Sequence, residues 1–140
     1  MNSQVIIDTN LVFAFLHKNQ AKSARFFFSN QDYIFLTPNF FVYETFFHHD
    51  VILEKSKAIP EATYSLFEKV VEKLFLINES TISVENFIDA YHLCKDVDDK
   101  DTPFVALSLE LNAPLWTRDG ILKTHLISKG FTNFFDESTL

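Results

Sequence analysis

Short apolar runs alternate along the whole chain with stretches in which apolar residues recur at helical spacing. The apolar runs predict strands at 4–7, 33–37, 75–77 and 114–117, with a fifth candidate at 131–135. The helical spacing predicts helices at 10–16, 18–29, 39–56, 60–74, 84–95, 99–111 and 119–128. This alternation predicts a three-layer α/β/α domain whose helices cover a central, mainly parallel sheet of four or five strands. Ligands of such sheets bind beyond the carboxyl ends of the strands.

The composition is that of one globular domain. The chain has 140 residues, of which 47% are apolar and 22% charged, with two Gly and four Pro. A chain of this length and composition can bury a core of its own, so we expect a single domain over residues 1–140. The sole cysteine, Cys94, excludes an intrachain disulfide and a cysteine-based zinc site, which favours a reducing compartment.

Charge and hydropathy narrow the class of partners and the location. The formal net charge of −7 argues against a broad basic surface for nucleic acid, so any nucleic-acid contact must be local or bridged by metal. The apolar start of the chain is interrupted by Asp8, Thr9 and Asn10, and no basic residue precedes it. We therefore expect no signal peptide and no membrane span, and a cytoplasmic protein.

Two aspartates follow predicted strands directly. Asp8 comes after the apolar run 5–7, and Asp119 ends the segment PLWTRD. If both strands are parallel, both carboxylates project into the crevice at the carboxyl edge of the sheet, where a metal ligand is expected. The alternative for each is a helix cap, since Asp is a favoured N-cap residue and a helix is predicted to follow.

Glu44 lies on a predominantly apolar helix face. Its neighbours three and four positions away are Phe40, Phe41, Phe47 and His48. Burying an unpaired carboxylate costs several kcal/mol, so Glu44 should have a cation, a strong donor or a raised pKa. The nearest lysine or arginine in sequence is Lys55, too far along the helix for a local ion pair, although a partner from elsewhere in the fold stays open.

Asp101 precedes the segment TPFVALSL and also has apolar neighbours at helical spacing. Here capping is the stronger local interpretation, because Asp98, Asp99 and Asp101 surround a helix N-terminus whose dipole favours negative charge. As a set, however, acids recur at two strand ends and on two helices that reach one crevice. Clustered carboxylates require a compensating cation, and hard oxygen ligands select Mg²⁺ or Mn²⁺. Such an ion promotes phosphodiester hydrolysis.

The residues resemble the PIN-domain nucleases over nearly the whole chain. The resemblance is carried by VIIDTNLVFAFL, by VYETFF, and by DTPFVALSLELNAPLWTRD. It implies a parallel sheet flanked by helices, a site of four acids for Mg²⁺ or Mn²⁺, and hydrolysis of RNA. By position, the acids that would hold the metal and act in catalysis are Asp8, Glu44, Asp101 and Asp119.

The resemblance also implies supporting residues and partners. Asn10 and Thr117 are similar to the polar residues that support the acids, and Asp98 is a reserve ligand. Apart from the resemblance, Arg118 directly precedes Asp119, so its guanidinium is a candidate contact for a substrate phosphate, with a solvent-exposed strand end as the alternative. Many small members resemble VapC-type toxins, each silenced by an antitoxin protein. Helix geometry adds a further expectation, because one helix face cannot readily hold Phe26, Phe27 and Phe28 together. We expect that helix to join a homodimer or antitoxin interface, with coverage of the rings by other helices and loops as the alternative.

The sequence therefore predicts a metal-dependent endoribonuclease, in the role of the toxin of a toxin–antitoxin pair. The alternative is a PIN-like regulatory module that binds RNA or protein without strong nuclease activity. A phosphate-accepting domain built on Asp8 is disfavoured, because no lysine partner lies near 113–117.

Overall fold

The computed structural model describes residues 3–16, 21–56 and 58–140. Four strands form one sheet in the order β3-β2-β1-β4, and all of their pairings are parallel. The strands are β1 (Ser3–Ile7), β2 (Tyr33–Pro38), β3 (Leu74–Ile77) and β4 (Leu115–Trp116). The central strand β1 ends in three fully buried residues, Val5, Ile6 and Ile7, as a strand covered on both faces requires.

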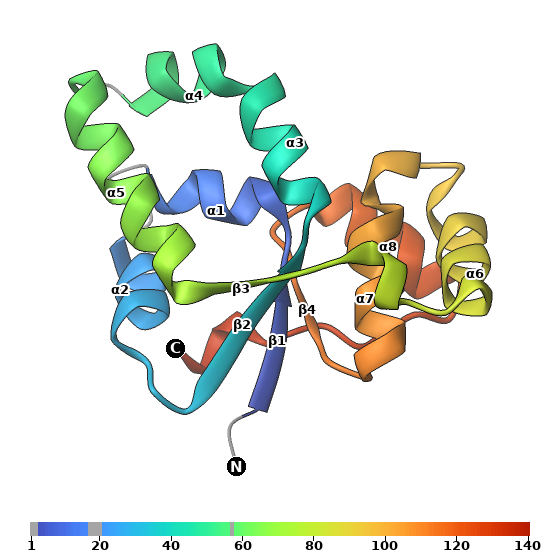
Figure 1. Ribbon diagram of the computed structural model, residues 1–140. Helices are drawn as coiled ribbons and strands as arrows, with labels where there is room; N and C mark the ends of the chain where they lie inside the picture. The colour runs from blue at the N-terminus through green and yellow to red at the C-terminus, as the bar shows by residue number, and fades with distance from the viewer. Residues whose placement is uncertain (1–2, 17–20, 57) are drawn as a thin grey trace.

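Helices cover both faces of the sheet, so the predicted three-layer α/β/α fold is confirmed (Figure 1). One face is covered by α1 (Thr9–Phe15), α2 (Ala21–Ser29) and α5 (Pro60–Lys73). The other is covered by α6 (Val84–Cys94), α7 (Thr102–Leu111) and α8 (Gly120–Ser128). The helices α3 (Phe40–Phe47) and α4 (His49–Ser56) follow the carboxyl end of β2 and extend beyond the sheet.

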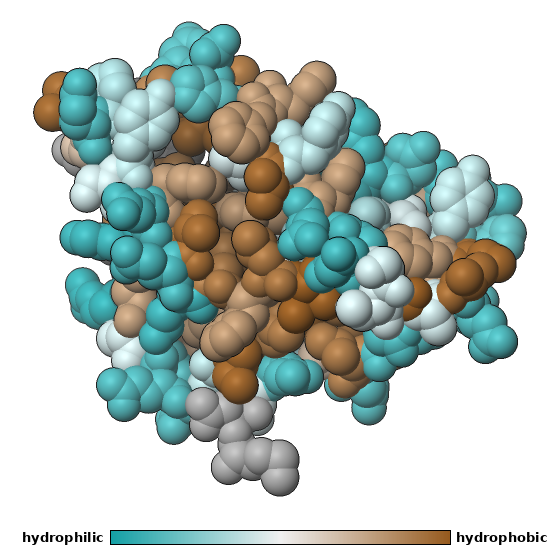
Figure 2. Space-filling model, viewed as in Figure 1, coloured by the Kyte–Doolittle hydropathy of each residue, from teal (hydrophilic) through white to brown (hydrophobic). Residues whose placement is uncertain are grey.

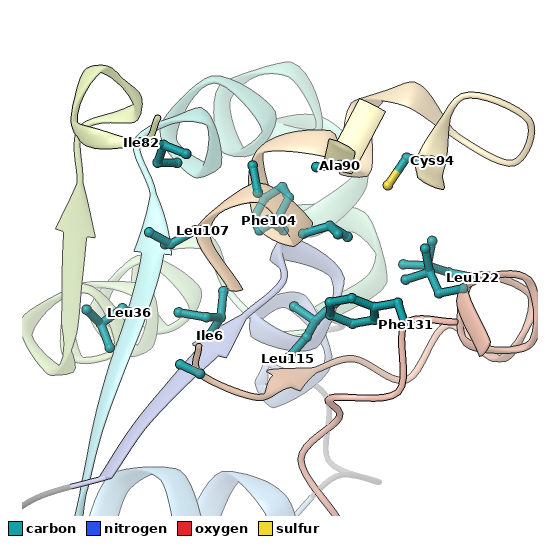
Figure 3. Packing of buried hydrophobic residues seen from close by; sticks show 14 residues of the cluster. Ile6, Leu36, Ile82, Ala90, Cys94, Phe104, Leu107, Leu115, Leu122 and Phe131 are labelled. Carbon is teal, nitrogen blue, oxygen red and sulfur yellow. The ribbon is translucent and has the colours of Figure 1, made fainter. Parts of the chain in front are cut away.

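Each face of the sheet has its own core. On the α6–α8 side, Ile6 and Leu115 of neighbouring strands pack with Phe104, Leu122 and Cys94, as Figure 3 shows. The other side is richer in aromatic rings, which come from Phe15, Phe27, Phe35, Phe41 and Trp116. The alternation of side chains along β1 divides its residues between the two cores, Ile6 on one side and Val5 and Ile7 on the other. Burial on both faces thus holds the end of β1 in place.

Short 3₁₀ turns complete the described chain at η2 (Glu79–Thr81), η3 (Asp99–Asp101) and η4 (Glu137–Thr139). The predicted helix 99–111 therefore begins with a 3₁₀ turn before α7. The start of the predicted helix 18–29 lies outside the described residues, and its described part is α2. No helix in the described part of the chain combines the length and apolar character that a membrane span requires.

The fifth candidate strand, 131–135, was wrong for the described chain. Its only pairing is an isolated bridge between Phe134 and Leu115, flanked by hydrogen bonds from Leu115 to Asn133 and from Phe135 to Leu115. Because β4 has only two residues, it offers too short an edge for a further strand to pair along. The segment instead packs its aromatic rings against the two cores, Phe131 and Phe134 on one side and Phe135 on the other.

The single helix predicted over 39–56 is two helices, divided at His48. His48 ends α3 with φ −101° and ψ 12°, and its amide donates back to the Glu44 carbonyl. Because the helix is interrupted here, the adjacent residues His48 and His49 contact different helices. The His48 ring lies 6.3 Å from that of Phe13 on α1, and the His49 ring stacks at 5.7 Å on Tyr64 of α5.

The exposed ring expected among Phe26, Phe27 and Phe28, on which their predicted interface rested, was wrong. Phe27 is fully buried, and Phe26 and Phe28 are partly buried against the same core. The ring of Phe26 by itself contacts those of Tyr33, Phe35, Trp116 and Phe135. The sheet and the C-terminal segment enclose this helix from different sides, so three consecutive rings all find partners within the chain.

Candidate active site

The acids predicted from the sequence lie around the point where the order of the strands reverses. The chain passes from β1 outward to β2 and β3, and then returns to place β4 on the other side of β1. At such a switch point the connections leave the sheet in opposite directions and open a crevice at the carboxyl ends of the strands. Asp8 follows β1 and Asp119 lies just beyond β4, so these two acids flank the crevice.

Asp8 is almost completely buried, with an exposed fraction of 5%. Its Oδ1 atom accepts a hydrogen bond of 2.8 Å from the Leu11 amide, which caps α1. Burial raises the pKa of Asp8 to about 6; hydrogen bonds from the Thr117 side chain and the Leu11 amide lower it, and the charges of Asp119 and Glu44 raise it. The capping interpretation is therefore correct, but Asp8 also faces other acids.

Asp119 makes the same local interaction. Its Oδ1 atom accepts a hydrogen bond of 3.0 Å from the Leu122 amide, which caps α8. Its own amide donates to Thr117 Oγ1 at 3.1 Å. Thr117 is buried and interacts with both aspartates, so it joins the two strand ends that carry them.

Glu44 reaches the same region from α3. Its Oε1 atom accepts a hydrogen bond of 2.7 Å from the Thr9 hydroxyl, the residue that follows Asp8. Burial raises the pKa of Glu44, while the Thr9 hydrogen bond and the positive charges of His48 and Lys100 lower it and the charge of Asp98 raises it. The strong donor expected for Glu44 is therefore a hydroxyl from α1.

Asp101 stands at the start of α7, but its side chain makes no capping hydrogen bond. The carboxylate that caps this turn is Asp98, whose Oδ1 atom accepts from the Lys100 amide at 3.0 Å. Burial, and after it the charges of Asp98, Asp8, Asp119 and Glu44, together raise the pKa of Asp101 to about 7. Asp98 thus has the local structural role, and Asp101 is the acid whose charge is opposed by all the others.

The structure brings the four predicted acids into electrostatic contact, at the place in Figure 1 where α1, α3 and α7 meet the ends of β1 and β2. Among the described residues, no three acidic, histidine or cysteine side chains stand close enough to hold a metal ion without moving. The donor set nevertheless fits a hard divalent cation, because it offers only oxygen and its charges repel one another in a partly buried site.

The remaining predicted residues divide into those near the acids and those that face elsewhere. Thr117 lies between Asp8 and Asp119, whereas Asn10 is exposed on α1. Arg118 lies against the C-terminal segment: its Nε donates to Glu137 Oε1 at 2.9 Å, and its Nη2 contacts the Ser23 hydroxyl. The guanidinium that was a candidate phosphate contact therefore has partners within the chain.

Sequence reasoning missed Thr9 and Thr37. Thr37 is fully buried and donates from its hydroxyl to the Ile7 carbonyl at 2.9 Å, which joins the ends of β2 and β1 beside Asp8. Both threonines bond to residues at least 30 positions away, so no local pattern indicates their partners. The one local signal was the position of Thr9 directly after a strand-terminal aspartate.

The fold and the site together define a parallel α/β domain with a cluster of acids at its switch point. The PIN domain family model matches residues 6–131, a range that includes all four predicted acids. The chain therefore belongs to the PIN domain family, whose members are generally nucleases. No curated protein matches the chain.

Proposed function

We propose that this protein is a metal-dependent endoribonuclease that hydrolyses RNA phosphodiesters with Mg²⁺ or Mn²⁺. The observation that supports the proposal is the mutual repulsion of the acids Asp8, Glu44, Asp101 and Asp119 in one partly buried site of a PIN domain. A cation relieves that repulsion and the desolvation together, which makes metal binding favourable at the cluster.

In this proposal, some residues bind the metal ion and others orient those ligands. The four acids would supply oxygen ligands, while Thr9 and Thr117 orient Glu44 and Asp8 through hydrogen bonds. A bound divalent ion polarises a phosphoryl oxygen and lowers the pKa of water, so no protein nucleophile is required. The helix caps at Asp8 and Asp119 each engage Oδ1, and these hydrogen bonds hold both carboxylates in orientations that would present oxygen to the ion.

Cleavage of a pooled structured RNA by the purified protein tests the proposal, with Mg²⁺, Mn²⁺ or EDTA present. Glu44→Gln keeps the size of the side chain and an oxygen that can accept from Thr9, but removes the charge. Glu54→Gln on α4 is the matched control, because Glu54 is exposed outside the acid cluster. We expect metal-dependent cleavage that is lost in Glu44→Gln and retained in Glu54→Gln.

The alternative is a PIN-like module that binds RNA or protein without strong nuclease activity. It predicts no cleavage with any metal and RNA binding that is indifferent to Glu44→Gln. Metal titration by calorimetry then separates the cases: heat that is lost in Glu44→Gln identifies a metal site with a narrower natural substrate, and no heat refutes the metal site.

We further propose that the protein acts in the cytoplasm as the toxin of a toxin–antitoxin pair and forms a homodimer. Support comes from exposed apolar residues on α3, α4, α5 and β3, which border a groove of about 380 Å³. Figure 2 shows apolar side chains gathered across the middle of the view, where Figure 1 labels β3. Phe75 and Leu76 of β3 are exposed by 58% and 40%. Large exposed apolar patches commonly mark binding sites.

Light scattering of the purified protein tests the homodimer, and coexpression with the product of an adjacent gene tests the antitoxin. We expect twice the monomer mass alone, and inhibition of RNA cleavage in the coexpressed complex. A monomer at micromolar concentration refutes the dimer. Undiminished cleavage in the complex refutes the antitoxin role for that gene product.

A further inference from the structure

Three aromatic rings stack along one side of α3. The rings of Phe40 and Tyr43 are 5.4 Å apart with an interplanar angle of 20°, and those of Tyr43 and Phe47 are 6.0 Å apart at 22°. Positions 40, 43 and 47 fall on one stripe of a helix, because each residue advances by about 100°. We call these three residues the α3 ring stripe.

The α3 ring stripe is anchored at one end and open at the other. Phe40 is partly buried and contacts Phe104 of α7 edge-on at 6.3 Å. Tyr43 and Phe47 are exposed by 59% and 65%. Two nearly parallel rings thus stand in solvent on a helix whose first ring belongs to the core. Packing in the core explains the aromatic ring of Phe40 but not the exposed rings of Tyr43 and Phe47.

The stripe runs beside the acid site and carries positive charge. Glu44, which hydrogen-bonds to Thr9, directly follows Tyr43 on α3. The Lys100 ammonium lies 6.0 Å from the centroid of the Phe47 ring, and the His48 ring packs edge-on against Phe47 at 5.0 Å. Both His48 and Lys100 also lower the pKa of Glu44. Flat aromatic surface, positive charge and the candidate active site therefore adjoin one another.

The opposite side of α3 lacks this combination. Phe46 is more exposed than Phe47, at 76%, but it borders the apolar groove of α3, α4 and α5. Around that groove lie aliphatic and aromatic side chains and hydroxyls, with His49 as the one titratable side chain besides Tyr64. A protein segment suits the groove, whereas exposed flat rings with a lysine ammonium beside them suit nucleotide bases joined by phosphates.

We propose that the α3 ring stripe is a stacking platform for unpaired bases of single-stranded RNA, which positions the adjoining phosphate at the acid site. Tyr43 and Phe47 stack on the bases, and Lys100 pairs with the backbone phosphate next to them. Bases held in a duplex cannot reach these rings, so the platform selects single-stranded segments. This inference rests on the proposed function for the identity of its ligand, and names the form of RNA that the site takes.

Fluorescence anisotropy with a short labelled single-stranded RNA of mixed sequence tests the platform by binding alone. All variants are made in an Asp119→Asn background with Mg²⁺ present, so that the strand stays intact. Tyr43→Leu and Phe47→Leu should each weaken binding by about 5- to 150-fold, as expected for loss of one base–aromatic stack. Phe46→Leu, which removes a still more exposed ring that lies outside the α3 ring stripe, should change binding by less than about twofold. Phe47→Tyr keeps an aromatic ring at this position and should bind the RNA as tightly as the protein with Phe47.

The same strand annealed to its complement should bind more weakly than the single strand and be insensitive to the ring variants. Equal losses in Phe46→Leu and Phe47→Leu, unchanged binding in both ring variants, or no binding of the single strand would overturn the proposal. Cleavage by the otherwise unmodified protein is measured separately. If it cleaves RNA and the ring variants cleave with unchanged KM, the platform fails and the nuclease stands; if it does not cleave but ring-dependent binding persists, the nuclease fails and the platform stands.

Discussion

Asp8 and Asp119 occupy the same local position, yet their surroundings differ. Each follows a parallel strand, and each caps the next helix by accepting from the amide three residues on. Asp8 ends the central strand β1, which has a strand on either side and a helical layer on each face. Asp119 follows β4, an edge strand of two residues, and is only partly buried.

The difference shows that a capping motif does not decide the chemistry of its aspartate. The cap gives both side chains an orientation, whereas burial gives Asp8 a pKa of about 6. A carboxylate that is held in place and poorly solvated gains more from a cation than a solvated one. We therefore expect metal binding to depend most on Asp8. It should depend less on Asp119, because water can solvate that partly exposed carboxylate.

The largest expected effect is on cleavage. Asp8→Asn and Asp119→Asn keep an oxygen for the helix cap but remove a negative ligand, so each should lower kcat/KM for RNA by at least about 10²-fold, with the greater loss in Asp8→Asn. Initial rates with Mg²⁺ measure this. Asp89→Asn, an exposed acid on α6, is the control and should keep full activity. A folded Asp8→Asn enzyme with full activity would refute the site.

Metal binding should give the next largest effect, on thermal stability. At pH 8, saturating Mg²⁺ should raise the Tm of the protein, since an ion at about 100 times its Kd stabilises the folded state by about 2.7 kcal/mol. Differential scanning fluorimetry with Mg²⁺ and with EDTA measures the shift. It should nearly vanish in Asp8→Asn and shrink less in Asp119→Asn. Equal shifts in both variants would contradict the distinction between the two acids.

Without metal, stability should fall as the pH rises. In the folded chain, burial raises the pKa of Asp8 from 3.8 to about 6 and that of Asp101 from 3.8 to about 7. Between about pH 4 and pH 7 the folded state therefore binds more protons than the unfolded state, and the free energy of unfolding decreases with pH.

In EDTA, the Tm should be several degrees lower at pH 8 than at pH 5, because about 1 kcal/mol shifts the Tm of a domain of this size by roughly 3–5 °C. Asp8→Asn should raise the Tm at pH 8 and leave it nearly unchanged at pH 5. A wild-type Tm that rises from pH 5 to pH 8 in EDTA, or a variant whose gain is the same at both pH values, contradicts the burial effect.

The smallest expected effect concerns the residue that joins the two strand ends. Thr117→Val removes a hydrogen bond to Asp8 and the acceptor for the Asp119 amide. The loss should destabilise the protein by about 1 kcal/mol and raise the pKa of Asp8 further, which moves the acidic limb of the pH–rate profile upward. Thr124→Val, an exposed position on α8, is the control. An unshifted profile in Thr117→Val would exclude Thr117 from a supporting role.

The sequence alone predicted most of the strands and helices and singled out the four candidate acids. Buried strands such as 5–7 are recognised because their apolar runs are continuous, and helices because apolar residues recur at their period. Both patterns are local, so the α/β alternation and the strand-terminal positions of Asp8 and Asp119 followed from them. The family resemblance extended this to Glu44 and Asp101, and the PIN domain match includes both.

Only the tertiary structure decided how those acids are supported. Glu44 accepts a hydrogen bond from Thr9 across 35 positions, and the Arg118 guanidinium contacts the Ser23 hydroxyl across 95. The failed fifth strand and the enclosed rings of α2 have the same cause: their surroundings come from segments distant in sequence. Hydrophobic periodicity specifies which side of an element is buried, but burial depth and hydrogen-bond partners depend on which other elements pack against it.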